Sequence, residues 1–172
     1  AIAIAADIVP IIDENRVLAF YGIEEINKNP RAGLREMTNS VKSKIKINDL
    51  VFRIAPRINS SGRMDKAISS VELLIQKNDK NLEELSEKIE LLNSDRRIKQ
   101  EIIVNEALVE IKNQKEKKTF STTVYKEDWH KGVIGIVASK LIEYYYKPTI
   151  VLTKSEGLIV GSVRSVKGFD IY

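Results

Sequence analysis

Residues 81–112 contain neither glycine nor proline, and this uninterrupted run constrains the fold more than any other feature of the chain. Asn81 followed by Glu84 has the spacing of a capping box, which predicts a helix start. A coiled coil would hold one apolar phase throughout, but here the phase drifts, so we expect a connecting helix that packs on two different bodies. The apolar positions of the run are Leu82, Leu85, Ile89, Leu92, Ile98, Ile102 and Ile103.

Patterns before this helix indicate the end of one α/β region. Residues 1–9 are apolar on both faces, which predicts a central strand of a parallel sheet. The residue before Pro56 should avoid the α region, so residues 54–56 are predicted to be extended or to turn. Helical spacing predicts further helices at residues 17–26, 34–41 and 65–75.

Patterns after the helix indicate the beginning of a second α/β region. Alternation predicts strands, and Ser155-Glu-Gly157 is typical of a hairpin turn. The predicted strands are 119–125, 149–153 and 158–163, with a helix at 132–146. We therefore expect three parts: residues 1–78, a connecting helix at 79–114, and residues 115–172.

Composition excludes several classes of function. With 172 residues, 43% of them hydrophobic, the chain can bury a core in one domain or two small ones. The net charge of +4 permits binding to a polyanion. The absence of cysteine excludes disulfides, thiolate zinc sites and cysteine nucleophiles, and it fits a reducing cytoplasm. No apolar run approaches the roughly 20 residues needed to span a membrane.

Two polar groups stand out in the first region. Asp7 would close the predicted strand at the sheet edge where such folds bind ligands, or it would instead cap a loop or pair with Arg16. On an extended segment Arg57 and Asn59 would face the same way, and Gly62 would let the chain fold back to bring Arg63 near them. Arginine's planar fork suits phosphate, although Arg57 could instead tie two elements together through a carboxylate.

Two more candidates lie in the second region. The helix start after His130 is a natural seat for an anion, and Trp129 could stack on a base. The alternatives are a core tryptophan and a capping histidine. In the predicted last strand, Ser162 and Arg164 alternate onto one face, which suits a terminal phosphate, and Gly161 would allow close approach. The alternative there is a surface strand end.

These segments together resemble the DHH phosphoesterase family, and within it the single-strand-specific 5′→3′ DNA exonucleases. The resemblance covers essentially the whole chain, which looks like the middle of such an enzyme. It implies the end of a parallel-sheet DHH domain, a connecting helix and the first part of a smaller α/β DHH-associated domain. The segments that carry it are Ala6-Asp-Ile-Val-Pro10, Pro56-Arg-Ile-Asn-Ser-Ser-Gly-Arg63, Trp129-His-Lys-Gly-Val-Ile-Gly-Ile-Val-Ala-Ser-Lys-Leu141 and Gly161-Ser-Val-Arg-Ser165.

The resemblance also implies roles for residues. Asp7 would be a catalytic ligand of Mn²⁺ or Mg²⁺, Arg57 and Arg63 would contact backbone phosphates, and Ser162 and Arg164 would anchor the 5′-terminal phosphate. The family's Asp-x-Asp and Asp-His-His motifs are absent, so we expect this chain alone to be inactive. The implied partners are single-stranded DNA with a 5′ end and single-strand-binding protein. The predicted DNA contacts are completed by Asn59, Trp129 and His130, although Asn59 could equally well stabilise its own loop.

Two other functions remain open at this point. One is a phosphodiesterase of the same superfamily that cleaves nanoRNA or cyclic dinucleotides, which the long helix and the two arginine segments disfavour. The other is a DNA-binding scaffold that descends from the nuclease and has lost its metal site.

Overall fold

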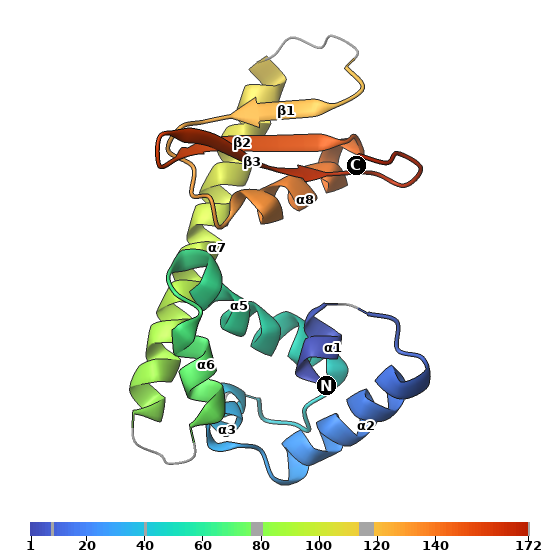
Figure 1. Cartoon of the computed structure of the whole chain (residues 1–172), viewed down its shortest axis with the longest axis vertical. Helices are drawn as coiled ribbons and strands as arrows, with labels where there is room; N and C mark the ends of the chain where they lie inside the picture. The colour runs from blue at the N-terminus through green and yellow to red at the C-terminus, as the bar shows by residue number, and fades with distance from the viewer. Residues whose placement is uncertain (8, 40, 77–80, 114–118, 172) are drawn as a thin grey trace. The chain divides into compact units, whose positions relative to one another are not determined.

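The computed structural model of the chain describes residues 1–7, 9–39, 41–76, 81–113 and 119–171 (Figure 1). The chain forms two compact units, Ala1–Ser94 and Asp95–Tyr172. The long helix α7 (Leu82–Asn113) belongs to both, and it confirms the helix predicted at residues 81–112. Helices together with a small sheet confirm the predicted α/β class. The predicted boundaries at 78–79 and 114–115 lie outside the described residues.

The first unit is helical throughout its described part. Its core consists of apolar side chains with almost no exposed surface: Leu50, Ile54, Leu73 and Ile89. The helix predicted at 17–26 is confirmed by α2, and the one predicted at 34–41 is confirmed by α3 only as far as Thr38. In chain order, the elements before α7 are α1 (Ile2–Ala6), α2 (Asp13–Lys28), α3 (Ala32–Thr38), α4 (Ile47–Asp49), the π-helical turn η1 (Leu50–Ile54), α5 (Ala55–Met64) and α6 (Ile68–Ile75).

The strand predicted at residues 1–9 is wrong, because Ile2–Ala6 is the helix α1. The alternation of alanine and isoleucine resembles a strand, but alanine has the highest helix propensity of all residues. The small side chains also allow α1 to lie close to α2: a β-carbon built on Gly22 would stand 2.6 Å from Cβ of Ala1. Local propensity and tight helix packing therefore outweigh the strand-like pattern.

The extended segment predicted at residues 54–56 is also wrong. Ala55 has the helical angles φ −58° and ψ −42°, and Pro56 occupies the first turn of α5. Proline is tolerated there because its missing N–H falls where the hydrogen-bond pattern changes from the π-helical turn to the α-helix. The chain thus passes through Pro56 without leaving helical geometry.

Buried serines allow α5 to pack closely on its neighbours. Ser61 Oγ donates to Ser70 Oγ of α6 (2.7 Å), and Ser70 Oγ donates to the carbonyl of Ile58 (3.0 Å). Ser60 Oγ lies 3.4 Å from the carbonyl oxygen of Ile89 in α7. Small hydroxyl side chains keep the helices close and satisfy their own polar atoms, which buried groups require. These serines therefore orient the helix that carries Arg57, Asn59 and Arg63.

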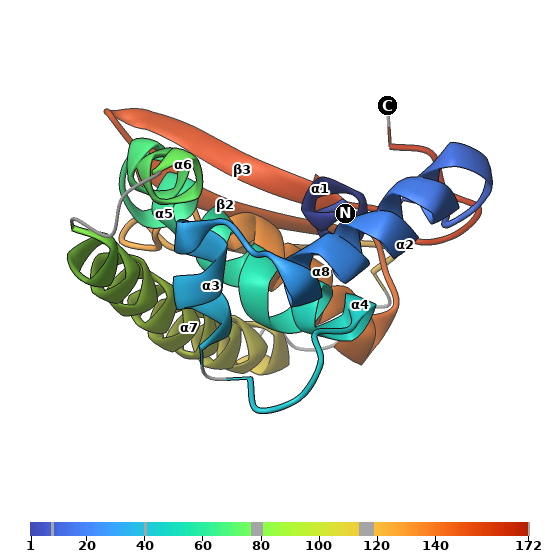
Figure 2. The ribbon, with the colours of Figure 1, turned by 90° about the horizontal axis from the view of Figure 1, so that it is seen from below.

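The second unit contains a three-stranded sheet in the order β1-β2-β3. β1 and β2 are parallel and joined through α8, whereas β2 and β3 form an antiparallel hairpin. Glu156 and Gly157 have φ values of 54° and 80°, as a tight two-residue turn requires. Figure 2 shows α8 alongside β2 and β3, which it contacts. The elements, which confirm the predicted strands and helix, are β1 (Thr122–Tyr125), α8 (Ile134–Tyr145), β2 (Thr149–Ser155) and β3 (Leu158–Arg164).

The core of the second unit lies between α8 and the sheet. Its fully buried side chains are Val124, Val133, Val137, Leu141 and Val151. Within the described part of the chain, no helix has the length and apolar character needed to cross a membrane.

Candidate functional site

Asp7 directly follows α1, and its side chain is exposed. Across the described residues, no group of three or more His, Cys, Asp or Glu side chains is placed to hold a metal ion. Two-metal hydrolysis needs several such ligands. The residues described here do not form a metal centre by themselves, so Asp7 offers one carboxylate and no more.

The α5 helix changes which predicted site residues share a face. Arg57 and Asn59 are two positions apart, so on a helix they do not point the same way, and the expected side-by-side pair is wrong. Asn59 and Arg63 are four positions apart and therefore share a face, where both are exposed. Gly62 lies inside the helix, so the predicted fold-back at this residue is absent.

Arg57 is held inside the first unit. Its side chain is 23% exposed, and its Nε lies 2.6 Å from Oε2 of Glu90 on α7. Nη1 also donates to the carbonyl of Met37 in α3 (3.1 Å). Arg57 thus ties three helices together, as in the structural ion-pair alternative, and its contact with phosphate stays a prediction.

Trp129 is a core residue of the second unit, with 4% of its surface exposed. Its indole Nε1 donates to Oε2 of Glu106 on α7 (2.7 Å), and Thr153 Oγ1 donates to its carbonyl (2.6 Å). Hydrogen bonds from Trp129 and then Lys126 lower the pKa of Glu106. A ring this deeply buried favours the core alternative over base stacking.

His130 is positioned by the turn before α8. Its Nδ1 accepts a hydrogen bond from the N–H of Gly132 (3.2 Å), which fits the capping alternative. Burial lowers the pKa of His130. The residue borders a hollow of about 420 Å³ whose walls carry lysines and carboxylates alike, among them Lys99, Lys131 and Asp128. Because side chains of both charges line this hollow, its electrostatics do not favour the binding of an anion there.

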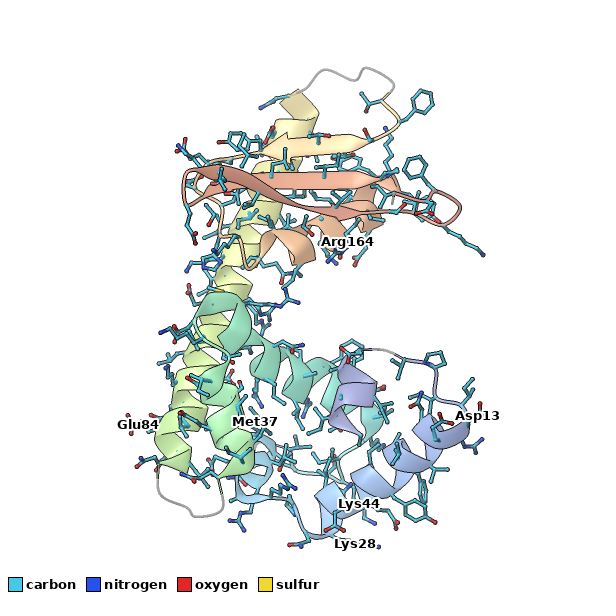
Figure 3. All side chains as sticks on the ribbon, viewed as in Figure 1. Asp13, Lys28, Met37, Lys44, Glu84 and Arg164 are labelled. Carbon is cyan, nitrogen blue, oxygen red and sulfur yellow. The ribbon has the colours of Figure 1, made fainter. Side chains whose placement is uncertain are left out.

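Ser162 and Arg164 lie on the face of β3 that meets α8. Their strand partners are Val151 and Thr149, which are both buried, so the predicted alternation onto one face is confirmed. A β-carbon built on Gly135 would stand 3.1 Å from Ser162 Oγ and 3.3 Å from Arg164 Nη2. Figure 3 labels Arg164 beside α8. The fold therefore brings the last two predicted segments together at the first turn of α8.

Known proteins are similar to the chain over its whole length. No family model matches it. Over 177 residues it is 37% identical to the single-stranded-DNA-specific exonuclease RecJ of Bacillus subtilis, with 100% of the chain and 22% of that protein covered. It is 34% identical to RecJ of Haemophilus influenzae, with 99% of the chain and 31% of that protein covered. The chain is therefore similar along its whole length to one segment of these RecJ proteins.

Solved structures of RecJ show the same similarity. Thermus thermophilus RecJ in complex with Mn²⁺ superimposes with a TM-score of 0.86 at 28% identity, covering 97% of the chain and 24% of that structure. An exonuclease RecJ bound to manganese gives a TM-score of 0.84 at 27% identity, covering 99% of the chain and 42% of that structure. The resemblance to the exonucleases of the DHH family is thus confirmed. The chain spans between 22% and 31% of the length of the two curated RecJ relatives.

Gly161 has a packing role in the sheet of the second unit. A β-carbon there would stand 2.4 Å from Cδ2 of Leu152 on the neighbouring strand. The space next to Gly161 is therefore filled by β2, and the predicted close approach of a ligand finds no room on that side.

Sequence reasoning missed three residues that shape the site: Glu106, Ser139 and Thr153. Ser139 lies in the Trp129–Leu141 segment four positions after Gly135, so helical spacing alone would have placed the two on one face. Glu106 and Thr153 carry no comparable local signal, because their partner Trp129 is distant in sequence.

Proposed function

We propose that the chain is part of a 5′→3′ exonuclease that degrades single-stranded DNA by metal-dependent phosphodiester hydrolysis, in recombination and repair. The observation that carries this proposal is the meeting of Ser162 and Arg164 at the first turn of α8. The names of the RecJ relatives support the activity. They also favour an exonuclease over a nanoRNA or cyclic-dinucleotide phosphodiesterase and over a scaffold without catalysis.

The second unit would bind the 5′-terminal phosphate. Among the described residues, neither Ser162 Oγ nor Arg164 Nη2 makes a hydrogen bond. A hydroxyl and a guanidinium donor that border one space suit an anion with several oxygens. The nearby N-terminus of α8 adds a favourable partial positive charge. His130 would contribute through the turn that precedes this helix.

The first unit would contact the backbone of the strand. Asn59 and Arg63 share the exposed face of α5 and are the proposed contacts there. Arg57 would have to exchange Glu90 for a phosphate. Asp7 would supply one carboxylate to a Mn²⁺ or Mg²⁺ site whose other ligands are not among the residues described here. Single-strand-binding protein is proposed as a partner from the family resemblance alone.

Removal of the Arg164 guanidinium tests the end-recognition role. In the full-length enzyme that carries this segment, Arg164→Ala should reduce the preference for 5′-phosphorylated over 5′-hydroxyl oligonucleotides by about tenfold, because a charge-assisted hydrogen bond is lost. The measurement is the ratio of kcat/KM for the two substrates. An unchanged ratio would remove Arg164 from the 5′-end pocket.

Removal of the Asp7 carboxylate tests the metal role separately. In the same enzyme, Asp7→Ala should abolish cleavage while strand binding is largely retained, because a metal ligand acts on the reacting phosphate rather than on the length of the strand. Cleavage assays and fluorescence anisotropy of a labelled oligonucleotide measure the two properties. Lost binding with residual cleavage would show that Asp7 was misassigned.

A further inference from the structure

We infer that Gly135 and Ser139 are positioning residues that hold Arg164 and Ser162 in the geometry needed to recognise a terminal phosphate. This inference rests on the proposed function and adds two residues of α8 to it. Neither residue would touch the scissile phosphate. They act through Arg164, whose guanidinium they orient and leave accessible.

Two contacts fix the guanidinium of Arg164. Its Nε donates to Ser139 Oγ (3.2 Å), and its Nη1 donates to the carbonyl of Val163 (2.8 Å). Ser139 Oγ in turn donates to the carbonyl of Gly135 (3.2 Å). A hydroxyl has one donor and two acceptor positions, so Ser139 makes both bonds at once. The two hydrogen bonds that run from Arg164 to Ser139 and from Ser139 to Gly135 therefore set the plane of the guanidinium against α8.

The absence of a side chain at Gly135 keeps the space next to the guanidinium open. A β-carbon there would stand 3.1 Å from Ser162 Oγ and 3.3 Å from Arg164 Nη2, closer than ordinary van der Waals contact. A phosphate oxygen that accepts from both groups must come within about 3 Å of each, and so must lie close to this space. A methyl group would push the two donors apart.

Backbone conformation does not explain this glycine. Among the described residues the glycines with positive φ are Gly157 and Gly168, so Gly135 has angles that alanine adopts freely. Alanine would also favour the helix by up to about 1 kcal/mol. The remaining physical reason for glycine is the room that it leaves beside Ser162 and Arg164.

The test compares variants in the full-length enzyme on single-stranded oligonucleotides with a 5′-phosphate or a 5′-hydroxyl. Gly135→Ala should lower the ratio of kcat/KM for the two substrates by about tenfold, as expected when one hydrogen bond to a charged group is lost. Its melting temperature should stay equal or rise. A merely structural glycine would behave in the opposite way, with lower stability and equal loss on both substrates, and that result would overturn the inference.

Ser139 provides a second, independent arm. Ser139→Ala should lower the same ratio by about threefold, because Arg164 keeps its bond to Val163 and only one orienting contact is lost. Ser139→Thr retains the hydroxyl and should restore the ratio. Lys140→Ala, which removes a surface ion pair with Glu143 on the same helix, is the matched control.

The outcomes separate the inference from the function on which it rests. If Arg164→Ala lowers the ratio but Gly135→Ala and Ser139→Ala do not, the positioning role is wrong and the proposed function stands. If the parent enzyme shows no preference between the two ends, or Arg164→Ala leaves it unchanged, end recognition by Ser162 and Arg164 fails, and the positioning role fails with it.

Discussion

The surroundings of His130 lower its pKa and so favour the neutral ring in the folded chain. Burial lowers its pKa most, the charge of Lys99 lowers it next, and Asp95 opposes that effect. The Nδ1 atom accepts a hydrogen bond from Gly132, which a protonated ring could not do. The neutral form is therefore the one that supports the turn before α8.

Stability should consequently depend on pH through this residue. Because the folded pKa lies below the ordinary value of about 6.5, the contribution of His130 is fully present above that pH and is lost as pH falls through the folded pKa. We expect a lower urea midpoint at pH 5.5 than at pH 7.5. His130→Gln, which can still accept from Gly132, should shrink this difference.

The chain suits this experiment because it contains a single histidine. Glu106 also has a shifted pKa, but a lowered carboxyl pKa gives stability that is lost only below about pH 4.5. If the urea midpoints at pH 5.5 and pH 7.5 differ by the same amount in His130→Gln and in the parent, the pH dependence does not come from His130.

At the scale of elements, close approach between helices shapes the first unit. A β-carbon on Gly33 of α3 would stand 1.9 Å from the carbonyl oxygen of Leu73 in α6. A β-carbon on Gly62 of α5 would instead lie 3.4 Å from Cβ of Ala67, which is close to an ordinary contact. Gly33 therefore occupies a place where a side chain would clash, whereas Gly62 occupies a place where a methyl group fits.

This contrast predicts opposite effects for the same substitution. Gly33→Ala should destabilise the chain by about 1–3 kcal/mol or more, because α3 and α6 must move apart. Gly62→Ala should be neutral or stabilise it by up to about 1 kcal/mol through helix propensity. Urea denaturation followed by circular dichroism measures both, and similar effects for the two variants would contradict the packing described here.

At the scale of the whole molecule, α7 is the element that both units share. The division falls after Ser94, whose side chain is exposed within the helix. The first half of α7 accepts the ion pair from Arg57 through Glu90, and the second half accepts the indole hydrogen bond through Glu106. One continuous helix therefore contributes to two separate cores.

A proline at the division tests the importance of this continuity. Ser94→Pro should reduce the helical signal and cost about 3 kcal/mol or more, because proline removes a hydrogen bond and clashes with the preceding turn. Emission from Trp129, the single tryptophan, should stay unchanged because its contacts lie within the second unit. Ser94→Ala is the control, and a red-shifted emission in the proline variant alone would show that the second core depends on an unbroken α7.

The sequence predicted elements best where one local signal acted alone. Alternation and a turn predicted β2 and β3, and the capping spacing at Asn81 predicted α7. The prediction of secondary structure failed at residues 1–6 and at Pro56, where local signals conflict. The alanines there favour a helix despite their alternation, and Pro56 enters a helix through a π-helical turn.

The sequence by itself determined the resemblance to RecJ exonucleases, the α/β class and the pairing of Ser162 with Arg164, because motifs and strand alternation are local properties. Only the tertiary structure decided that Arg57 bonds to Glu90, that Trp129 is buried against Glu106, and that Gly135 leaves room beside Arg164. Each of these depends on which distant residue arrives next to the side chain. Packing sets that choice, and spacing along the chain does not encode it.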